Sequence, residues 1–395
     1  MDEPVSLTAR LDAWDARRAG WGGALFQGRA APGPGAEVLM SNDYLAIGAH
    51  PHVVERQVAA LRAGGCGALM SGAHLADGDP QRALEARLAA FLDAPSVRLC
   101  QSGWAANVGL VQAIAPPCSP VYVDAAAHAS LRAGIDAARA AARVFAHNDT
   151  GHLERLIGRH GPGLIAVDTL YSVGGDFCPL PEIVEVAERS GCAVVADESH
   201  TLGVLGPDGA GLVPALGLAG RVAYRTASLA KAFAGRAGLV ACDRRVGAYL
   251  PYHAHPAVFS TALLPHDVAG LAAVLDLVEI GDRRRARLAR NAALLRDGLA
   301  GLGYNIAPSR SHIVSLRPGG EDALCRLQGA LDAEGVFGAP FAHPAVGRNG
   351  AALRFSVHAG LTKRRVARIL DACAAVRDTA DVTRWRSTRR LAAAR

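Results

Sequence analysis

The chain has 395 residues, of which 50% are hydrophobic and 20% charged, and it exceeds the usual size of a single hydrophobic core. We therefore expect two domains. The net charge of +6 comes almost wholly from arginine, with short clusters at 283–285 and 364–365. Such clusters lie on a solvated helix face or attract a polyanionic substrate. No basic tract is interleaved with aromatic residues, which argues against a nucleic-acid partner.

The cysteine pattern and the N-terminus indicate the compartment. Eight cysteines are scattered without a C-x-x-C pair, as expected for reduced thiols. The first residues lack the basic-then-apolar pattern of a signal peptide, and no uninterrupted apolar run is long enough to span a bilayer. These features predict a cytoplasmic protein without a membrane partner.

The predicted elements begin with a short helix at 6–20 and a Gly/Pro-rich loop at 31–36. Short apolar strands then alternate with Ala- and Leu-rich helical segments. The expected strands are 97–100, 121–123, 164–167, 193–196, 222–224 and 239–242. Continuous apolar strands between helices predict a mostly parallel sheet covered on both faces. Ligands of such sheets bind beyond the carboxyl ends of the strands.

The C-terminal third predicts a smaller α+β unit. An amphipathic stretch at 266–302 predicts a helix linking two domains, and strands at 312–316 and 353–357 precede a helix that starts at Thr362. The tail from Arg384 is expected to fray. The expected divisions are an N-terminal arm at 1–40, a large domain at 41–275, a linker helix with a small domain at 276–383, and a tail at 384–395.

Lysine is nearly absent, and one of the two lysines stands in an apolar, small-residue setting. Lys231 lies within TASLAKAFAG at 226–235, whereas Lys363 lies in a basic helical stretch where solvation is expected. Arginine could replace an ordinary surface lysine, but only a primary amine forms a Schiff base with an aldehyde. Lys231 is therefore a candidate for covalent chemistry, although chance could also leave one lysine at a helix start.

An acidic residue ends one of the predicted buried strands. Asp197 follows CAVVA at 192–196, and a buried carboxylate requires a charged or hydrogen-bonding partner. A protonated pyridine nitrogen would be one such partner. The alternative is that Asp197 caps the next helix.

Seven blocks of sequence occur in the order typical of one enzyme family. They are SNDYL at 41–45, QSGWAAN at 101–107, HASL at 128–131, AHND at 146–149, YSVGGD at 171–176, DESH at 197–200 and SLAKAF at 228–233. Over about 41–370 the chain resembles the α-oxoamine synthases, which are fold-type-I pyridoxal phosphate (PLP) enzymes. The resemblance implies an α/β fold whose large domain has a mostly parallel seven-stranded sheet, with a smaller C-terminal α+β domain.

The resemblance implies a role for each matching residue around the cofactor, pyridoxal 5′-phosphate. Lys231 would form the Schiff base and later move the α-proton, and Asp197 would pair with the pyridinium nitrogen. His128 would stack on the ring, although without the resemblance it reads as an exposed histidine at a helix start. His200 and Ser172 would hydrogen-bond the phenolic oxygen. No metal is expected.

Two further groups of residues follow from the same resemblance. The phosphate would be held by Ser102, Gly103, Trp104 and Ser228, and across a homodimer with shared sites by Ser260 and Thr261. The substrates would be held by Arg354, which would clamp the amino-acid carboxylate, and by Asn42 and Asp168 near the acyl group.

The implied reaction is a decarboxylative Claisen condensation between an amino acid, or S-adenosylmethionine, and an acyl-CoA. It releases CoA and CO2 and gives an α-aminoketone. Three positions depart from the biotin- and haem-pathway members: AGRAG at 234–238 replaces a Gly-x-x-Gly-Gly-like run, Ser199 replaces alanine, and Gln81 replaces histidine. The pattern most resembles the autoinducer synthase branch, which uses medium-chain acyl-CoA.

Three alternatives remain open. An 8-amino-7-oxononanoate or 5-aminolevulinate synthase would need a second cation for its acyl carboxylate, and Arg29 is a candidate. A non-catalytic partner subunit or cofactor-binding regulator is a different class, against which the retention of Lys231, Asp197, His200 and Arg354 argues. An ordinary aminotransferase fits the order of the motifs less well.

Overall fold

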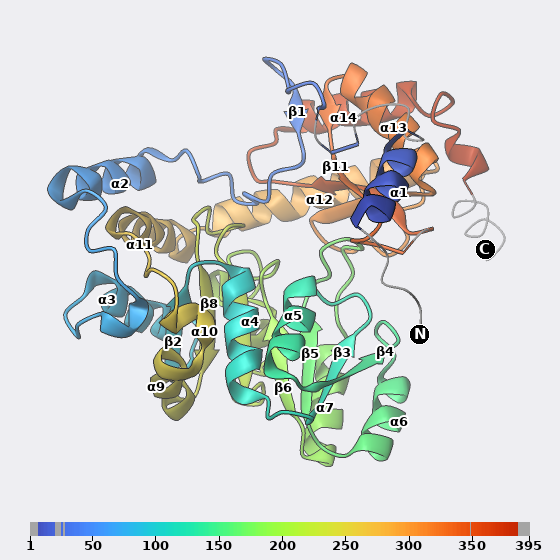
Figure 1. Cartoon of the computed structure of the whole chain (residues 1–395). Helices are drawn as coiled ribbons and strands as arrows, with labels where there is room; N and C mark the ends of the chain where they lie inside the picture. Colours follow the sequence, from blue (N-terminus) through green and yellow to red (C-terminus); the bar gives the residue numbers. More distant parts are fainter. Residues whose placement is uncertain (1–6, 20–24, 27, 348, 386–395) are drawn as a thin grey trace. The chain divides into compact units, whose positions relative to one another are not determined.

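The computed structural model describes residues 7–19, 25–26, 28–347 and 349–385 (Figure 1). The chain divides into two compact units. The sheet unit comprises Asn42–Ser172 and Asp176–Leu288. The terminal unit comprises the described residues of Met1–Ser41, Val173–Gly175 and Ala289–Arg395. No described helix combines the length and the apolar character that a membrane span requires.

The sheet unit is built on seven strands in the order β2-β8-β7-β6-β5-β3-β4. Their bounds are β2 Ser96–Cys100, β3 Pro120–Asp124, β4 Ala141–Phe145, β5 Leu164–Asp168, β6 Ala193–Asp197, β7 Tyr224–Ser228 and β8 Gly238–Cys242. Only β8 runs antiparallel to its neighbours among these strands. The predicted mostly parallel α/β sheet is therefore confirmed.

Apolar residues on both faces explain why the strands are continuous hydrophobic runs. Along β6, Val194 and Ala196 pack into one buried cluster, whereas Val195 packs into the other. Successive side chains of a strand point to opposite faces, so a sheet covered by helices on both sides needs no polar alternation. One cluster includes residues of α6 (Thr150–His160) and α7 (Leu180–Ser190), and the other includes residues of α4 (Gly103–Ile114) and α5 (Ala129–Ala138).

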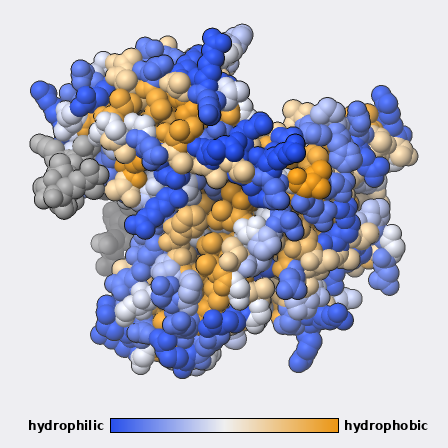
Figure 2. Space-filling model, turned by 180° about the vertical axis from the view of Figure 1, so that it is seen from behind, coloured by the Kyte–Doolittle hydropathy of each residue, from blue (hydrophilic) through white to orange (hydrophobic). Residues whose placement is uncertain are grey.

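The remaining helices of the sheet unit that Figure 1 labels gather on the side of β2. The remaining helices are α2 Pro51–Gly64, α3 Pro80–Phe91, α8 Leu212–Ala215, α9 Arg244–His253, α10 His255–Val258 and α11 Pro265–Glu279, with short 3₁₀ turns η1 Gly72–His74 and η2 Pro207–Gly209. The surface in Figure 2 mixes hydrophobic with hydrophilic residues, as expected because no chain has enough polar residues to cover its surface.

The terminal unit contains a small antiparallel sheet in the order β11-β12-β9, beside a parallel pair of β1 and β10. The bounds are α1 Leu7–Ala19, β1 Glu37–Val38, β9 Ile313–Gly319, α13 Glu321–Ala333, β10 Val336–Phe337, β11 Ala339–Phe341, β12 Ala351–Ser356, α14 Lys363–Ala375 and η3 Val382–Arg384. The Thr362 hydroxyl caps α14 by accepting the Arg365 N–H at 3.3 Å. A smaller α+β unit at this end of the chain was predicted. Most of the predicted tail at 384–395 lies outside the described residues.

Two predictions about elements were wrong, and one strand was missed. The strand expected at 222–224 begins at Tyr224 and runs through the polar residues of β7, and β4 was not predicted. The helix expected at 266–302 is two helices, because α11 ends at Glu279 and α12 spans Asp282–Gly301. At the break, the Gly281 N–H donates to the Val278 carbonyl at 2.9 Å.

A buried ion pair explains why β7 is polar. Glu198 and Arg225 have side chains only 2% and 4% exposed, and Arg225 Nε donates to Glu198 Oε2 at 2.7 Å. The same guanidinium donates to the carbonyl oxygens of Leu92 at 2.7 Å and Ala210 at 2.8 Å. Because a charge inside a strand costs free energy unless it is paired, this arginine ties β7 to three other segments.

We predict that Arg225→Met will lower the free energy of unfolding by about 3–5 kcal/mol, because it leaves the Glu198 carboxylate buried without its ion pair. Urea unfolding measures the loss. Arg221→Met is the matched control: it breaks an exposed pair with Glu188 and should cost much less. Equal losses in the two variants would contradict the prediction.

Candidate active site

A cavity of about 170 Å³ lies at the carboxyl ends of the parallel strands, and we call it the strand-end cavity. It is lined by Ser102, Gly103, Trp104, Asn107, His128, Asp168, Asp197, Ser199, His200, Ser228 and Lys231. These residues follow or end β2, β3, β5, β6 and β7. Parallel strands bring their carboxyl ends to one edge, so residues distant in the sequence meet there.

The N-terminus of α4 forms one wall. Ser102 is the N-cap residue, and its hydroxyl accepts the Ala105 N–H at 3.1 Å. A Cβ on Gly103 would lie 2.5 Å from Ser228 Cβ, so only glycine permits this approach of α4 to β7. The free N–H groups at a helix start and the helix dipole favour an anion at this wall.

Asp197 forms the floor from the end of β6 and is 5% exposed. Its Oδ2 accepts from Asn107 Nδ2 at 2.7 Å, and its Oδ1 accepts from the Ser199 N–H at 2.8 Å. The residues after Asp197 form turns, so the alternative that Asp197 caps a following helix is wrong. A buried carboxylate held by neutral donors suits a cationic partner in the cavity.

Asp168 lies beside Asp197 because β5 and β6 pair these residues in register. It is 3% exposed, and its Oδ1 accepts the His128 backbone N–H at 3.1 Å. Burial raises the pKa of Asp168 well above its usual range, and the nearby Asp197 charge acts in the same direction. The cavity thus holds two buried carboxyl groups side by side.

A hydrogen-bonded chain links His200 to Asn42. The buried hydroxyl of Tyr44 lies 2.7 Å from His200 Nδ1 and donates to Asn42 Oδ1 at 3.2 Å. The Tyr44 hydroxyl thus contacts both side chains, one from each end of the chain of bonds. Asn42 thereby reaches a cavity residue through Tyr44.

Lys231 and Ser228 reach the cavity from β7 and the loop that follows it. Ser228 donates its backbone N–H to Ser199 Oγ at 2.7 Å, and its own Oγ accepts the Ala230 N–H at 3.3 Å. Three residues after Lys231, Ala234 has a positive φ of 46°, a conformation that favours glycine. This is one of the positions at which the chain departs from the glycine-rich run of the resembling enzymes.

Five predicted site residues do not line the strand-end cavity, and one of them is Asn42, whose link to it runs through Tyr44. Ser172 follows Tyr171 in a turn, and Ser260 and Thr261 are exposed after α10. The Thr261 carbonyl accepts from Gln101 Nε2 at 2.7 Å. Arg354 is buried on β12 of the terminal unit, with its guanidinium 4.8 Å from the centre of the Phe341 ring.

Three residues around the site had no predicted role. Asn107 and Ser199 line the cavity, and Tyr44 contacts His200. A signal for Asn107 was present: it lies one helical turn after Gly103, so both face the same side of α4. The contacts of Tyr44 and Ser199 join distant segments, and sequence spacing does not reveal them. Among the described residues, no group of three or more His, Cys, Asp or Glu is arranged to hold a metal ion.

His147, from the AHND block, lies in an ion-pair cluster of the sheet unit. Its Nδ1 is 2.8 Å from Asp124 Oδ1, and its Nε2 is 2.7 Å from Asp176 Oδ2. Burial opposes the charged ring, but the two aspartates outweigh it and raise the pKa of His147 to about 9. The ring also packs edge-on against Tyr171, with the ring centres 4.4 Å apart. The imidazolium therefore ties β3 to the turn after β5.

We predict that His147 stabilises the fold below its unfolded pKa of roughly 6.5, and that this contribution is lost as pH rises through about 9. The difference in unfolding free energy between the native chain and His147→Gln should thus shrink between pH 6.5 and 9.5. Urea unfolding at several pH values measures it, with His160→Gln as control at the exposed end of α6. A difference that grows with pH would overturn the prediction.

The chain belongs to the class I and II aminotransferase family, whose model matches residues 37–373. It is 42% identical over 342 residues to the CAI-1 autoinducer synthase of Vibrio campbellii, with 87% of each chain covered. It is 35% identical over 340 residues to the 8-amino-7-oxononanoate synthase of Exiguobacterium sibiricum, with 85% of this chain and 86% of that protein covered.

A solved structure shows the same fold. The serine palmitoyltransferase of S. paucimobilis with bound PLP-myriocin aldimine superposes with a TM-score of 0.89 at 25% identity, covering 95% of this chain and all of that one. The predicted fold-type-I transferase fold and the relation to the α-oxoamine synthases are therefore confirmed, and the protein is an enzyme.

Proposed function

We propose that the enzyme is a PLP-dependent acyltransferase that joins an amino acid, or S-adenosylmethionine, to a medium-chain acyl-CoA. It releases CoA and CO2 and forms an α-aminoketone, the precursor of an autoinducer. The similarity to the CAI-1 autoinducer synthase supports the choice of product class. The observation that carries the proposal is the strand-end cavity, where a primary amine, a buried carboxylate and a helix N-terminus meet.

The residues of the cavity fit pyridoxal phosphate. Gly103 lets the start of α4 lie against Ser228 at the end of β7, and the free N–H groups of that helix start suit a phosphate. Asp197 is a buried acceptor for a protonated ring nitrogen, and Lys231 supplies an amine for an aldehyde. When bound, the cofactor supplies that aldehyde and a ring that draws electrons from the α-carbon of the substrate.

We assign roles to the residues as follows. With the cofactor bound, Lys231 would condense with its aldehyde, with loss of water, and its Nζ would later move the α-proton, while Asp197 would hold the proton of the ring nitrogen. His128 would stack on the ring, and His200 and Ser172 would hold the phenolic oxygen. The phosphate ligands are Ser102, Gly103, Trp104 and Ser228, with Ser260 and Thr261 from the partner subunit. The substrates are held by Arg354 at the carboxylate and by Asn42 and Asp168 at the acyl group.

The contacts of Arg29 favour an acyl group without a terminal carboxylate. Arg29 Nε and Nη2 donate to both carboxylate oxygens of Asp332, at 3.1 and 2.6 Å, and Nη1 donates to the Gly338 carbonyl at 3.2 Å. A bidentate pair of this kind commits the guanidinium. Succinyl or pimeloyl recognition by Arg29 would first have to break the pair with Asp332.

We predict that cofactor-loaded protein will release thiol from medium-chain acyl-CoA with a small neutral amino acid or S-adenosylmethionine. The assay is a grid of acyl-CoAs (acetyl to dodecanoyl, succinyl, pimeloyl) against glycine, alanine, serine, 2-aminobutyrate and S-adenosylmethionine. Lys231→Ala should reduce release to background, because it removes the amine. Lys363→Ala removes the other lysine, on the surface, and should leave release unchanged.

Other outcomes of the grid discriminate among the alternatives. Preference for pimeloyl- or succinyl-CoA would assign the protein to cofactor biosynthesis, and transamination without thiol release would assign it to the ordinary aminotransferases. Release that persists in Lys231→Ala would overturn the assignment of the amine. No release across the grid from loaded protein would favour the non-catalytic alternative.

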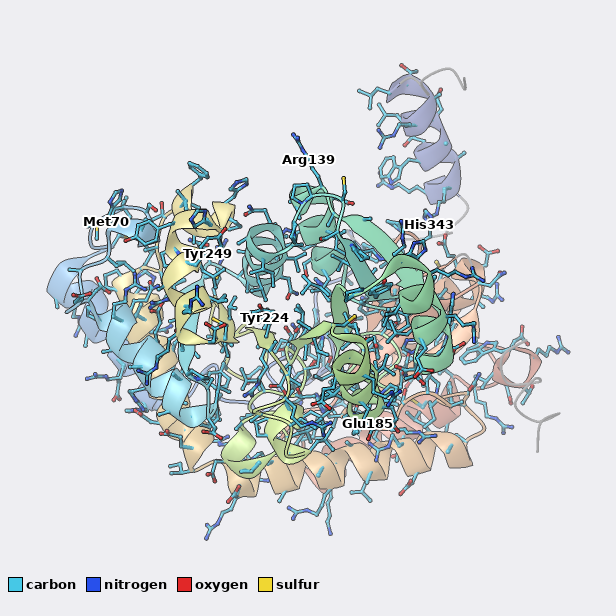
Figure 3. All side chains as sticks on the ribbon, turned by 90° about the horizontal axis from the view of Figure 1, so that it is seen from below. Met70, Arg139, Glu185, Tyr224, Tyr249 and His343 are labelled. Carbon is cyan, nitrogen blue, oxygen red and sulfur yellow. The ribbon has the colours of Figure 1, made fainter. Side chains whose placement is uncertain are left out.

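We further propose that the enzyme is a cytoplasmic homodimer with shared active sites and the domain divisions expected from the sequence. The support for a dimer is an exposed aromatic surface on the sheet unit, formed by Tyr249, Tyr252 and Phe259, which are 41%, 74% and 80% exposed. The three aromatic side chains border a hollow of about 540 Å³. In the sequence, Phe259 directly precedes Ser260 and Thr261. Figure 3 marks Tyr249 on α9. Large exposed aromatics gathered in one place mark interaction sites.

We predict that Tyr252→Asp combined with Phe259→Asp will weaken the dimer at least about tenfold, because both replacements put a charge into an apolar contact. Sedimentation velocity over a dilution series measures the dissociation constant. Leu216→Asp, at an exposed leucine after α8, is the control. A dimer of unchanged affinity in the double variant would place the interface elsewhere.

A further inference from the structure

The side-chain amide of Asn107 bonds the cavity residue Asp197 and, through Ser130, connects to His128. Its Nδ2 donates to Asp197 Oδ2 at 2.7 Å and to Ser130 Oγ at 2.8 Å, and its Oδ1 accepts from Thr226 Oγ1 at 2.5 Å. Asn107, Ser130 and Thr226 are 2%, 0% and 1% exposed. The amide has one orientation, because turning it over would point Oδ1 at the Asp197 carboxylate.

Ser130 links the oriented Asn107 amide to the ring of His128. The Ser130 hydroxyl accepts a proton from Asn107, so its own proton goes to His128 Nδ1, which lies 2.6 Å from Oγ. The Ser130 backbone N–H also donates to Nδ1, at 3.3 Å. With two donors directed at it, Nδ1 is an acceptor, and the proton of the neutral ring is on Nε2.

The other groups around His128 agree with a neutral ring. The Trp104 ring meets the His128 ring edge-on, with the ring centres 6.1 Å apart. The backbone N–H of His128 donates to Asp168. Although the ring is open to the cavity on one side, partial burial lowers the pKa of His128. The Lys231 charge acts in the same direction and the Asp197 charge opposes it.

We propose that Asn107 and Ser130 are positioning residues that hold His128 as a neutral imidazole protonated on Nε2, and that Asn107 couples this state to the Asp197 carboxylate. The consequence for catalysis rests on the proposed function. Asp197 favours a positive charge on the pyridine ring, and an imidazolium stacked on that ring would oppose it. One amide thus bonds the Asp197 carboxylate and, through Ser130, sets the tautomer of the His128 ring.

The tautomer can be read directly by nitrogen NMR on full-length protein labelled with ¹⁵N-histidine, with and without PLP. A His128→Gln spectrum identifies the His128 signals among those of the 14 histidines. We expect His128 at neutral pH to show a bare Nδ1 and a protonated Nε2 in the protein without PLP. A proton on Nδ1, or a doubly protonated ring, would overturn the inference without any variant.

Ser130→Ala tests the connection, because it removes the hydroxyl donor and leaves the Asn107 bond to Asp197 in place. The titration of His128 should move up by about one pH unit, the effect of losing one hydrogen bond to the neutral ring. Ser130→Cys, whose thiol is a weak donor, should give a smaller shift. Ser190→Ala, which removes a hydroxyl bound to the Val186 carbonyl at 2.7 Å, should give none. An unchanged titration in folded Ser130→Ala would contradict the role of Ser130.

Asn107→Leu tests the coupling to Asp197. In loaded protein, the pH dependence of the PLP absorbance should shift in Asn107→Leu and remain close to that of the native protein in Ser130→Ala. Identical dependences in native protein and folded Asn107→Leu would contradict the coupling. The NMR result without PLP does not depend on turnover, so failure of the proposed reaction and failure of this inference are distinguishable.

Discussion

Two consecutive buried acids at the end of β6 are the constraint on which the sheet unit depends. Asp197 and Glu198 are 5% and 2% exposed, and neither could remain ionised there without partners. Glu198 takes Arg225 as its ion pair and also accepts the Val213 N–H at 2.8 Å. Asp197 takes the neutral donors of Asn107 and Ser199, which leaves its charge available to the strand-end cavity.

The two neighbouring acids therefore have different roles: Glu198 stabilises the fold, and Asp197 faces the strand-end cavity. The Glu198 pair is closed, because the Arg225 guanidinium is bound on all sides by Glu198 and by two carbonyl oxygens. The Asp197 site is open, because its donors carry no charge to neutralise it. A fold that used a cation for both acids would offer no uncompensated buried negative charge to a bound cofactor.

Close backbone approach is the second requirement of the site. Gly103 lets α4 reach Ser228, and a Cβ on Gly238 would lie 2.1 Å from the Ser102 carbonyl oxygen. Where the chain departs from a glycine-rich pattern, the backbone accepts strain instead, as at Ala234 with its positive φ. Ser199, another departure, contributes a hydroxyl that accepts the Ser228 N–H and so holds the end of β7 that Gly103 contacts.

The sequence by itself determined the alternating architecture and most of the cavity. Apolar runs between helices define parallel strands, and the polar residues that follow them, such as Ser102, Asp197 and Lys231, must meet at one edge. It could not locate β7, because Arg225 and Thr226 are polar for tertiary reasons: one pairs with Glu198 and the other bonds Asn107. Only the tertiary structure assigned partners to Tyr44, Asn107, Ser130 and Ser199. Hydrogen bonds between distant segments, such as the one between Tyr44 and His200, which are 156 residues apart, depend on how strands and helices pack and leave no periodic signal in the sequence.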